Sequence, residues 1–167
     1  MEKKQVLDHG YCALVESWGS DERIVEAARM STGKGFQGWG TVEKPGDEKL
    51  LKYLWENKHG TPFEMAGMTV EIQAPIVVFR ECYRASLLVS AAHDHAALDR
   101  WNVVHVGRYS RMRASANLRN WLAFLTLRSD HVLSGRAAQW EIRQFANAVG
   151  DLIAETFPRT WALFAQP

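Results

Sequence analysis

The chain has 167 residues, of which 47% are hydrophobic and 23% are charged, a composition typical of one globular domain with its own hydrophobic core. The formal net charge of +1 excludes the strong positive field that gathers polymeric nucleic acid or an anionic membrane surface. The first residues lack the apolar stretch of a signal peptide, and no window approaches the roughly 20 apolar residues of a membrane span. We therefore expect a single cytoplasmic domain over residues 1–167.

The N-terminal part reads as a strand pair, a helix, a loop and a second helix. Residues 5–17 mix β-branched and aromatic residues and predict a strand or a strand pair. Ser20 is a candidate N-cap for a helix over SDERIVEAARMS, which carries acidic residues in its first turn. Residues 33–47 are rich in glycine and predict a mobile loop with a flap at its tip. The amphipathic pattern of residues 47–58 predicts the second helix.

The stretch HGTPFE, residues 59–64, has a structural and a functional interpretation. Thr61 and Glu64 fit a T-x-x-E capping box with a proline at the first helical position, which is a complete structural explanation for both. His59 follows the preceding helix, and local spacing favours a role in closing that helix. The alternative is that these side chains line a nucleotide site.

The next residues predict a strand, a helix and then a segment without clear periodicity. MTVEIQ alternates as a strand does, and Pro75 then opens a helix on which Arg80 and Arg84 share a face. Local evidence leaves Arg84 open between a surface charge and a site residue. From about residue 85 to 113 no element is clear, except that NVVHVGRY is consistent with a short strand.

The C-terminal part predicts two long helices. Leucine and tryptophan form an apolar stripe over residues 115–130, and the pattern continues over residues 137–157. Asn117 and Arg128 are eleven residues apart, about three helical turns or ~16 Å, so a long ligand bound to one side of the helix would reach both. A role for Arg128 in capping the carbonyls at the helix end explains it equally well.

The cysteines and paired histidines do not point to a metal site. Cys12 and Cys82 form no CxxC motif, which argues against a disulfide framework or a zinc site and fits a reducing cytoplasm. His93 and His95 form an HxH pair, but no third ligand stands at a recognisable spacing, so a surface loop is favoured. We predict no bound metal.

Several blocks, taken in order, resemble the flavin-dependent thymidylate synthases. They are AARMS at residues 27–31, NKHGTPFEMAGMTVEIQAPIVVFRE, NLRNWLAFLTLR, and AQWEIRQFANAV with FPRTWALF. The resemblance implies an α+β fold, with a twisted antiparallel sheet and flanking helices, assembled as a homotetramer with shared sites. It also implies FAD as cofactor, NADPH as reductant, methylenetetrahydrofolate as carbon donor, and methylation of dUMP to dTMP without a cysteine nucleophile.

The resemblance also assigns site residues, one position at a time. The flavin-side positions fall on Ser31, His59, Thr61, Glu64, Arg84, Asn117 and Arg119. Glu81, Arg84 and Arg128 fall on the side of the dUMP substrate. Arg128 matches the catalytic arginine that polarises the uracil ring, a role that suits a permanently charged guanidinium.

The central signature of the family is where this chain departs from it. The family pattern is RHRxxSxNExSxRY, whereas this chain reads RASLLVSAAHDHAA from Arg84. Ala85 and Ser86 replace a histidine and an arginine, and Asp94 falls at a phosphate-binding position, which weakens anion binding. A divergent paralogue and an altered reading frame both explain this atypical segment. The alternative to an active synthase is therefore a catalytically silent member that binds flavin or nucleotide or acts as a scaffold subunit.

Overall fold

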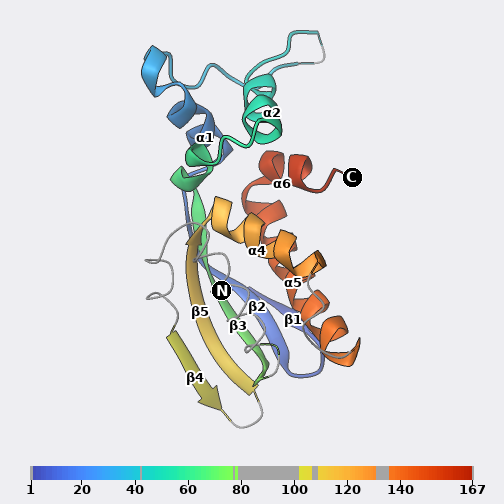
Figure 1. The fold of residues 1–167 in the computed structure, drawn as a ribbon. Helices are drawn as coiled ribbons and strands as arrows, with labels where there is room; N and C mark the ends of the chain where they lie inside the picture. Colours follow the sequence, from blue (N-terminus) through green and yellow to red (C-terminus); the bar gives the residue numbers. More distant parts are fainter. Residues whose placement is uncertain are drawn as a thin grey trace.

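The computed structural model describes residues 2–41, 43–76, 78, 102–106, 109–130 and 136–166. Within them, five antiparallel strands form one sheet in the order β1-β2-β3-β5-β4 (Figure 1). The strands are β1 (Lys3–Val6), β2 (Gly10–Trp18), β3 (Gly67–Pro75), β4 (Asn102–Val106) and β5 (Tyr109–Asn117). The helices are α1 (Asp21–Ala28), α2 (Glu48–Glu56), α4 (Leu118–Asp130), α5 (Arg136–Thr156) and α6 (Pro158–Phe164), with 3-10 turns η1 (Met30–Thr32) and η2 (Thr61–Met65).

The α+β class is confirmed, with an antiparallel sheet and flanking helices. The N-terminal strand pair is also confirmed, since β1 and β2 form a hairpin. Ser20 caps α1 as predicted, because its hydroxyl accepts a hydrogen bond from the Arg23 N–H at 3.3 Å. No helix of the described residues is long and apolar enough to span a membrane.

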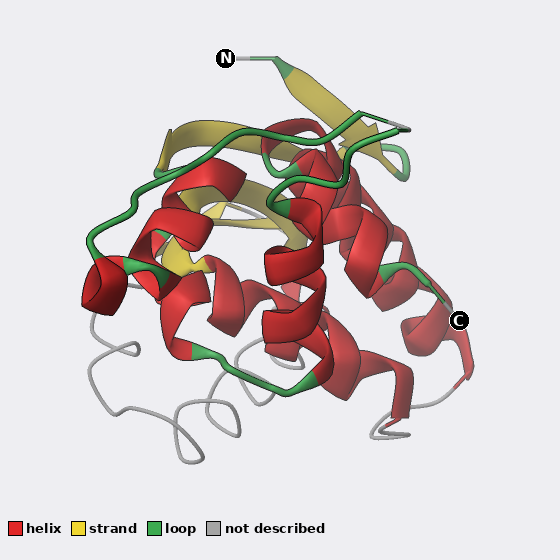
Figure 2. Ribbon diagram, turned by 90° about the horizontal axis from the view of Figure 1, so that it is seen from above, coloured by secondary structure: helices red, strands yellow, loops and turns green. Residues whose placement is uncertain are grey.

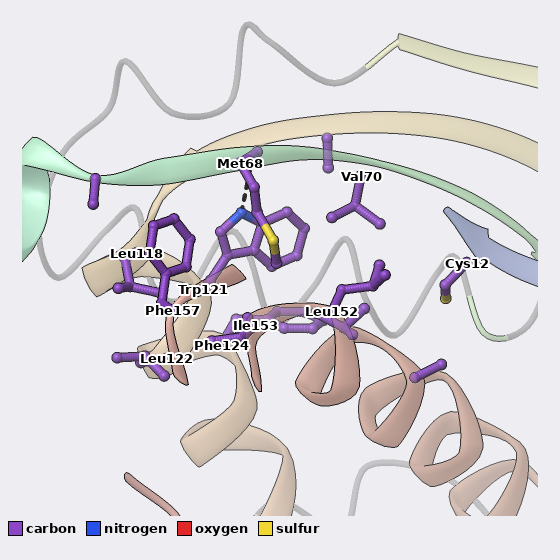
Figure 3. Close-up of a cluster of buried hydrophobic side chains, with 14 of the residues drawn as sticks. Cys12, Met68, Val70, Leu118, Trp121, Leu122, Phe124, Leu152, Ile153 and Phe157 are labelled. Atoms are coloured by element: carbon purple, nitrogen blue, oxygen red, sulfur yellow. Dashed lines mark hydrogen bonds between the residues drawn. The ribbon is translucent and has the colours of Figure 1, made fainter. Parts of the chain in front are cut away.

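The hydrophobic core lies between one face of the sheet and the helices α4 and α5 (Figures 1 and 3). Met68 and Val70 of β3 point toward this layer, where Trp121 of α4 and Ile153 of α5 are fully or nearly fully buried. The indole N–H of Trp121 donates to the Met68 carbonyl at 3.0 Å, so the tryptophan is buried without losing its polar partner. This bond fixes α4 against the central strand.

The opposite face of β3 carries polar side chains, as period-two alternation requires. Glu71 is only 5% exposed and accepts hydrogen bonds from the Tyr11 hydroxyl at 2.7 Å and from Arg113 Nε at 2.8 Å. Burial raises the pKa of Glu71, but these two hydrogen bonds and the positive charges of Arg113 and Arg111 together outweigh burial and leave the pKa below its ordinary value. The carboxylate therefore joins three neighbouring strands, β2, β3 and β5.

The start of α4 corrects the helix predicted over residues 115–130. Ser115 pairs with Thr69, and Asn117 pairs with Gly67, so both belong to β5 and the helix begins at Leu118. Pairing with β3 overrides the helical pattern because it satisfies the backbone N–H and C=O groups of this stretch. Asn117 is therefore the last residue of β5, directly before the helix that carries Arg128, and their predicted spacing stays a prediction.

Several predictions concern residues outside the described ranges. The helix predicted after Pro75 is described only at residues 76 and 78. Glu81, Arg84 and Cys82 lie outside the described residues, as does the His93–His95 pair. Arg128 lies on α4, but its side chain is not described.

Candidate functional site

The HGTPFE turn begins where α2 ends. Lys58 has a φ of +56°, a left-handed conformation that stops the helix, and the His59 N–H then donates to the Leu54 carbonyl at 2.9 Å. The backbone of His59 therefore closes the helix, while its imidazole is exposed and stacks on Tyr53 with ring centroids 5.8 Å apart. The exposed imidazole thus rests against the aromatic ring of Tyr53.

The predicted capping box is wrong. Residues 61–65 form the 3-10 turn η2, whose N-cap is Gly60 and which has no side-chain cap hydrogen bond. The Glu64 carboxylate instead forms an ion pair with the Arg119 guanidinium, and both side chains are about one-third exposed. A charged partner attracts a carboxylate more strongly than a backbone amide does. Thr61 is exposed, and its hydroxyl does not cap η2.

The turn and the beginning of α4 are in direct contact, although they are far apart in the sequence. The Leu118 N–H donates to the Ala66 carbonyl at 2.7 Å, and Gly60 lies so close to Arg119 that an added Cβ would stand 2.6 Å from Arg119 Nε. Figure 1 shows η2 beside the first turn of α4 at one end of the sheet. The structure therefore brings two of the sequence blocks, HGTPFE and NLR, into one place.

Asn117 has a structural role at this junction. Its side-chain oxygen accepts a hydrogen bond from the Asn120 N–H at 2.9 Å, so Asn117 caps the N-terminus of α4. The positive end of the helix dipole and the Arg119 guanidinium consequently lie at the same point of the surface. An anionic group such as a phosphate is the ligand that this combination favours.

Ser31 lies on a different segment from the HGTPFE turn. It is exposed on η1, directly after α1, and the loop of residues 33–47 joins η1 to α2. In Figure 2 this loop extends along one side of the molecule. The ends of α2 thus connect the segment that contains Ser31 with the turn that contains His59.

The glycine-rich loop is held at several points. Trp39 donates its indole N–H to Glu22 at 2.7 Å and lies under the guanidinium of Arg159, 4.2 Å from the ring centroid. Within the loop, the backbone N–H groups of Gly40 and Gly46 both donate to the Glu48 carboxylate. The hydrogen bond from Gly40 is the main reason that the pKa of Glu48 is lowered. The prediction of a loop is confirmed, and the prediction of a flap at its tip stays a prediction.

Three features of this region were not predicted from the sequence. They are the Tyr53 ring on His59, the close approach of Gly60 to Arg119, and an ion pair between Arg29 and Asp47. The contacts of Arg119 and of Arg29 join segments that no local sequence pattern connects. Among the described residues, no group of His, Cys, Asp and Glu side chains is arranged to hold a metal ion.

Comparison with a protein family identifies the class to which this fold and site belong. Residues 13–93 and 102–159 match the sequence model of a family described as thymidylate synthase complementing protein. The chain therefore belongs to this family, the flavin-dependent thymidylate synthases, which are methyltransferases.

Individual relatives agree with this assignment. The chain is 29% identical to the flavin-dependent thymidylate synthase of Thermus thermophilus, over an alignment length of 223 that covers 96% of this chain and 77% of the relative. Because this chain has 167 residues, that alignment includes positions at which only the relative has a residue. The corresponding enzyme of Wolbachia pipientis wMel is 45% identical over 83 residues, which are 50% of this chain and 28% of the relative.

A solved structure has the same fold. It is the crystal structure of the UMP/dUMP methylase PolB from Streptomyces cacaoi bound with 5-Br UMP, with a TM-score of 0.66. The two proteins are 20% identical, and the superposition covers 96% of each chain. At this identity the likeness establishes the fold and not the ligand.

Proposed function

We propose that this chain binds FAD and methylates dUMP to dTMP, with methylenetetrahydrofolate as carbon donor and NADPH as reductant. The observation that carries the proposal is the contact between the HGTPFE turn and the first turn of α4. In this contact Arg119 pairs with Glu64 and lies against Gly60, at the positive end of a helix. Family membership supports the same assignment.

The side chains present fit a flavin dinucleotide, whose diphosphate is anionic. Arg119 supplies charge-assisted donors, and the exposed Thr61 hydroxyl and His59 imidazole supply further polar contacts. Ser31 lies on the second segment that the resemblance assigns to the flavin. Glu64 holds the Arg119 guanidinium in place, since the two side chains are paired. When bound, FAD supplies the redox chemistry by accepting hydride from NADPH and passing it on.

The remaining roles in the proposal belong to the substrate. Glu81 and Arg84 bind dUMP, and Arg128 polarises the uracil and favours ionisation at its ring nitrogen, since the guanidinium stays charged at every working pH. The proposed assembly is a homotetramer with shared sites.

A second candidate function is a catalytically silent subunit that keeps the scaffold and binds flavin or nucleotide. The sequence favours it at one place, because Ala85 and Ser86 stand where the family has a histidine and an arginine. Alignment positions that only the relatives fill also favour it. This candidate shares the flavin site with the first and differs in turnover.

Two measurements test the proposal in order. The first is the visible absorbance spectrum of the purified protein, followed by titration with FAD if it is colourless. A perturbed flavin spectrum supports the cofactor site. A flavin spectrum that stays that of free FAD throughout the titration overturns it. The second is tritium release from labelled dUMP with both cosubstrates present. Release supports the synthase, whereas FAD binding without release supports the silent subunit.

A further inference from the structure

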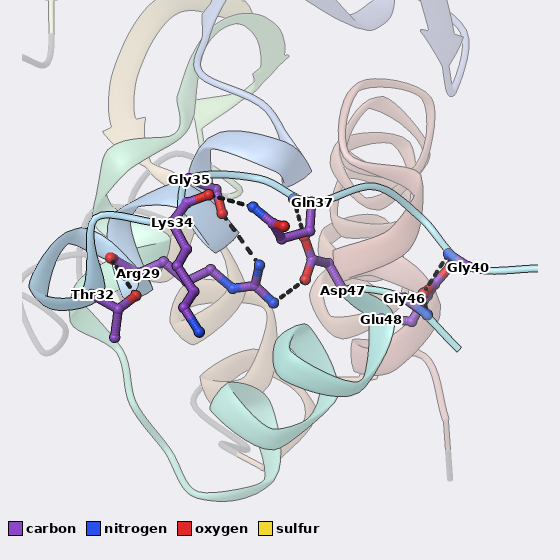
Figure 4. Close-up of polar contacts among 9 residues, drawn as sticks. All are labelled: Arg29, Thr32, Lys34, Gly35, Gln37, Gly40, Gly46, Asp47 and Glu48. Atoms are coloured by element: carbon purple, nitrogen blue, oxygen red, sulfur yellow. Dashed lines mark hydrogen bonds and ion pairs between the residues drawn. The ribbon is translucent and has the colours of Figure 1, made fainter. Parts of the chain in front are cut away.

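The end of α1 and the beginning of α2 are joined by a partly buried ion pair between Arg29 and Asp47 (Figure 4). Asp47 is 1% exposed, and the side chain of Arg29 is 22% exposed. A buried carboxylate is costly unless it is fully hydrogen-bonded, so the contacts of this group show what the fold uses it for.

Asp47 occupies the N-cap position of α2 but does not cap that helix with its side chain. Its Oδ2 accepts a hydrogen bond from the Gln37 N–H at 2.7 Å, and its own N–H donates to the Gly38 carbonyl at 3.0 Å. Capping is the ordinary role of an aspartate at this position. Here the carboxylate is directed to Arg29 and to the loop instead, so its role is to connect segments.

Arg29 holds both ends of the short segment that follows it. Its carbonyl accepts hydrogen bonds from the Thr32 N–H at 2.9 Å and from the Gly33 N–H at 3.1 Å, and these bonds form the turn η1. Its guanidinium donates to the Gly35 carbonyl at 3.3 Å. Ser31 therefore lies in a loop that begins at the backbone of Arg29 and is closed by the side chain of the same residue.

The two residues together determine how this segment sits relative to α2. The planar guanidinium offers several donors in fixed directions, so one arginine binds Asp47 and Gly35 at the same time. From its N-terminus at Asp47, α2 leads to the turn that contains His59. The ion pair thus links two segments that the proposed function places on the flavin side.

We propose that Arg29 and Asp47 are positioning residues for flavin binding, which hold the segment containing Ser31 in place before the cofactor arrives. This inference rests on the proposed function. If residues 30–38 are already ordered in the free protein, FAD binding does not have to order them, and the entropic cost that would weaken affinity is avoided. The pair acts through the backbone of residues 30–38 and is not assigned a contact with the cofactor.

The test compares Asp47→Asn with a matched control, Asp21→Asn. Asp21 is also a buried aspartate, 4% exposed, and it accepts hydrogen bonds from the Arg159 N–H at 2.8 Å and the Thr160 N–H at 3.2 Å. Its contacts join α1 to α6 and do not involve residues 30–38. Both substitutions remove a buried carboxylate of the same size, so both should lower Tm by several degrees.

Of these two substitutions, only Asp47→Asn should change FAD affinity and the mobility of residues 30–38. We expect it to raise the Kd for FAD about tenfold, because binding must then order the released segment. We also expect faster hydrogen–deuterium exchange over residues 30–38. Arg29→Lys keeps the charge but loses the second directed donor, so it should raise the Kd as well. Asp21→Asn should leave both the Kd and this exchange near the wild-type values.

Two outcomes overturn the positioning role. One is an Asp47→Asn protein that binds FAD as tightly as wild type, and the other is an Asp21→Asn protein that loses as much affinity as Asp47→Asn. The second would show that affinity follows general stability. Absence of FAD binding by the wild-type protein is a separate result, because it overturns the proposed function before any variant is compared.

Discussion

The substitution Gly60→Ala tests whether the position of Arg119 matters for flavin binding. Gly60 has φ −72° and ψ −30°, a conformation that alanine adopts freely, so the added methyl group strains no backbone. Its Cβ would lie 2.6 Å from Nε and 2.9 Å from Cζ of Arg119, which is closer than such atoms approach. The flexible arginine side chain must therefore move away from the turn.

Stability and binding are expected to respond differently to this change. Alanine limits the freedom of the unfolded chain and stabilises the protein by about 0.4–1 kcal/mol. Displacing the guanidinium weakens a partly exposed ion pair with Glu64, which costs ~0–1 kcal/mol. These effects offset each other, so the free energy of unfolding should change by less than about 1 kcal/mol. A lost hydrogen bond from a charged donor to FAD costs about 1.5–3 kcal/mol, roughly a tenfold to hundredfold rise in Kd.

The assay measures Tm by calorimetry and the Kd for FAD by titration of flavin fluorescence. Arg23→Ala is the control, since Arg23 forms a comparable exposed ion pair with Glu26 on α1 at 2.8 Å. We expect little change in stability and no change in FAD affinity for this control. Wild-type affinity in Gly60→Ala would refute the role of Arg119, and equal losses in both variants would refute the argument from geometry.

Three further predictions concern other parts of the molecule. Burial raises the pKa of Glu71, but its hydrogen bonds and the nearby arginines lower this pKa by more than burial raises it. The ionised Glu71 carboxylate therefore stabilises the fold above the ordinary pKa of 4.5, and this stabilisation is lost as the pH falls through the lowered pKa. As the pH is lowered below 4.5, stability should therefore fall less in Glu71→Gln than in wild type, and equal pH profiles would contradict this. Trp39→Ala removes the 2.7 Å hydrogen bond to Glu22 and should speed proteolysis within residues 33–47, whereas an unchanged cleavage rate would argue against anchoring by this ring. Arg128→Ala should abolish tritium release from labelled dUMP while FAD binding and the oligomer persist, and unchanged turnover would rule out its catalytic role.

The secondary structure was largely predictable from local patterns. Ser20 marks the start of α1 because a cap is an interaction with a residue three positions away. The alternation of MTVEIQ predicts β3 because one face of that strand packs on the core and the other is polar. The boundary of α4 was not predictable, since Asn117 fits a helix locally and joins β5 only through its pairing with Gly67.

The candidate site shows the same division. The sequence shows the blocks that contain Glu64 and Arg119, and the resemblance assigns both residues to the flavin side, but local spacing predicts a capping box for Glu64. Its actual partner is 55 residues away. The sequence could not rank these partners, because the local partner is visible in the order of residues and the distant one is not.

The sequence by itself determined the family, the class of fold and most helices and strands, because caps, turns and hydrophobic periods act over a few residues. Only the tertiary structure decided which side chains meet. Strand pairing sets where α4 begins, and packing then brings Gly60 against Arg119. The contact of Arg29 with Asp47 likewise depends on how α1 and α2 are arranged. Such contacts are set by three-dimensional packing, which no short stretch of sequence contains.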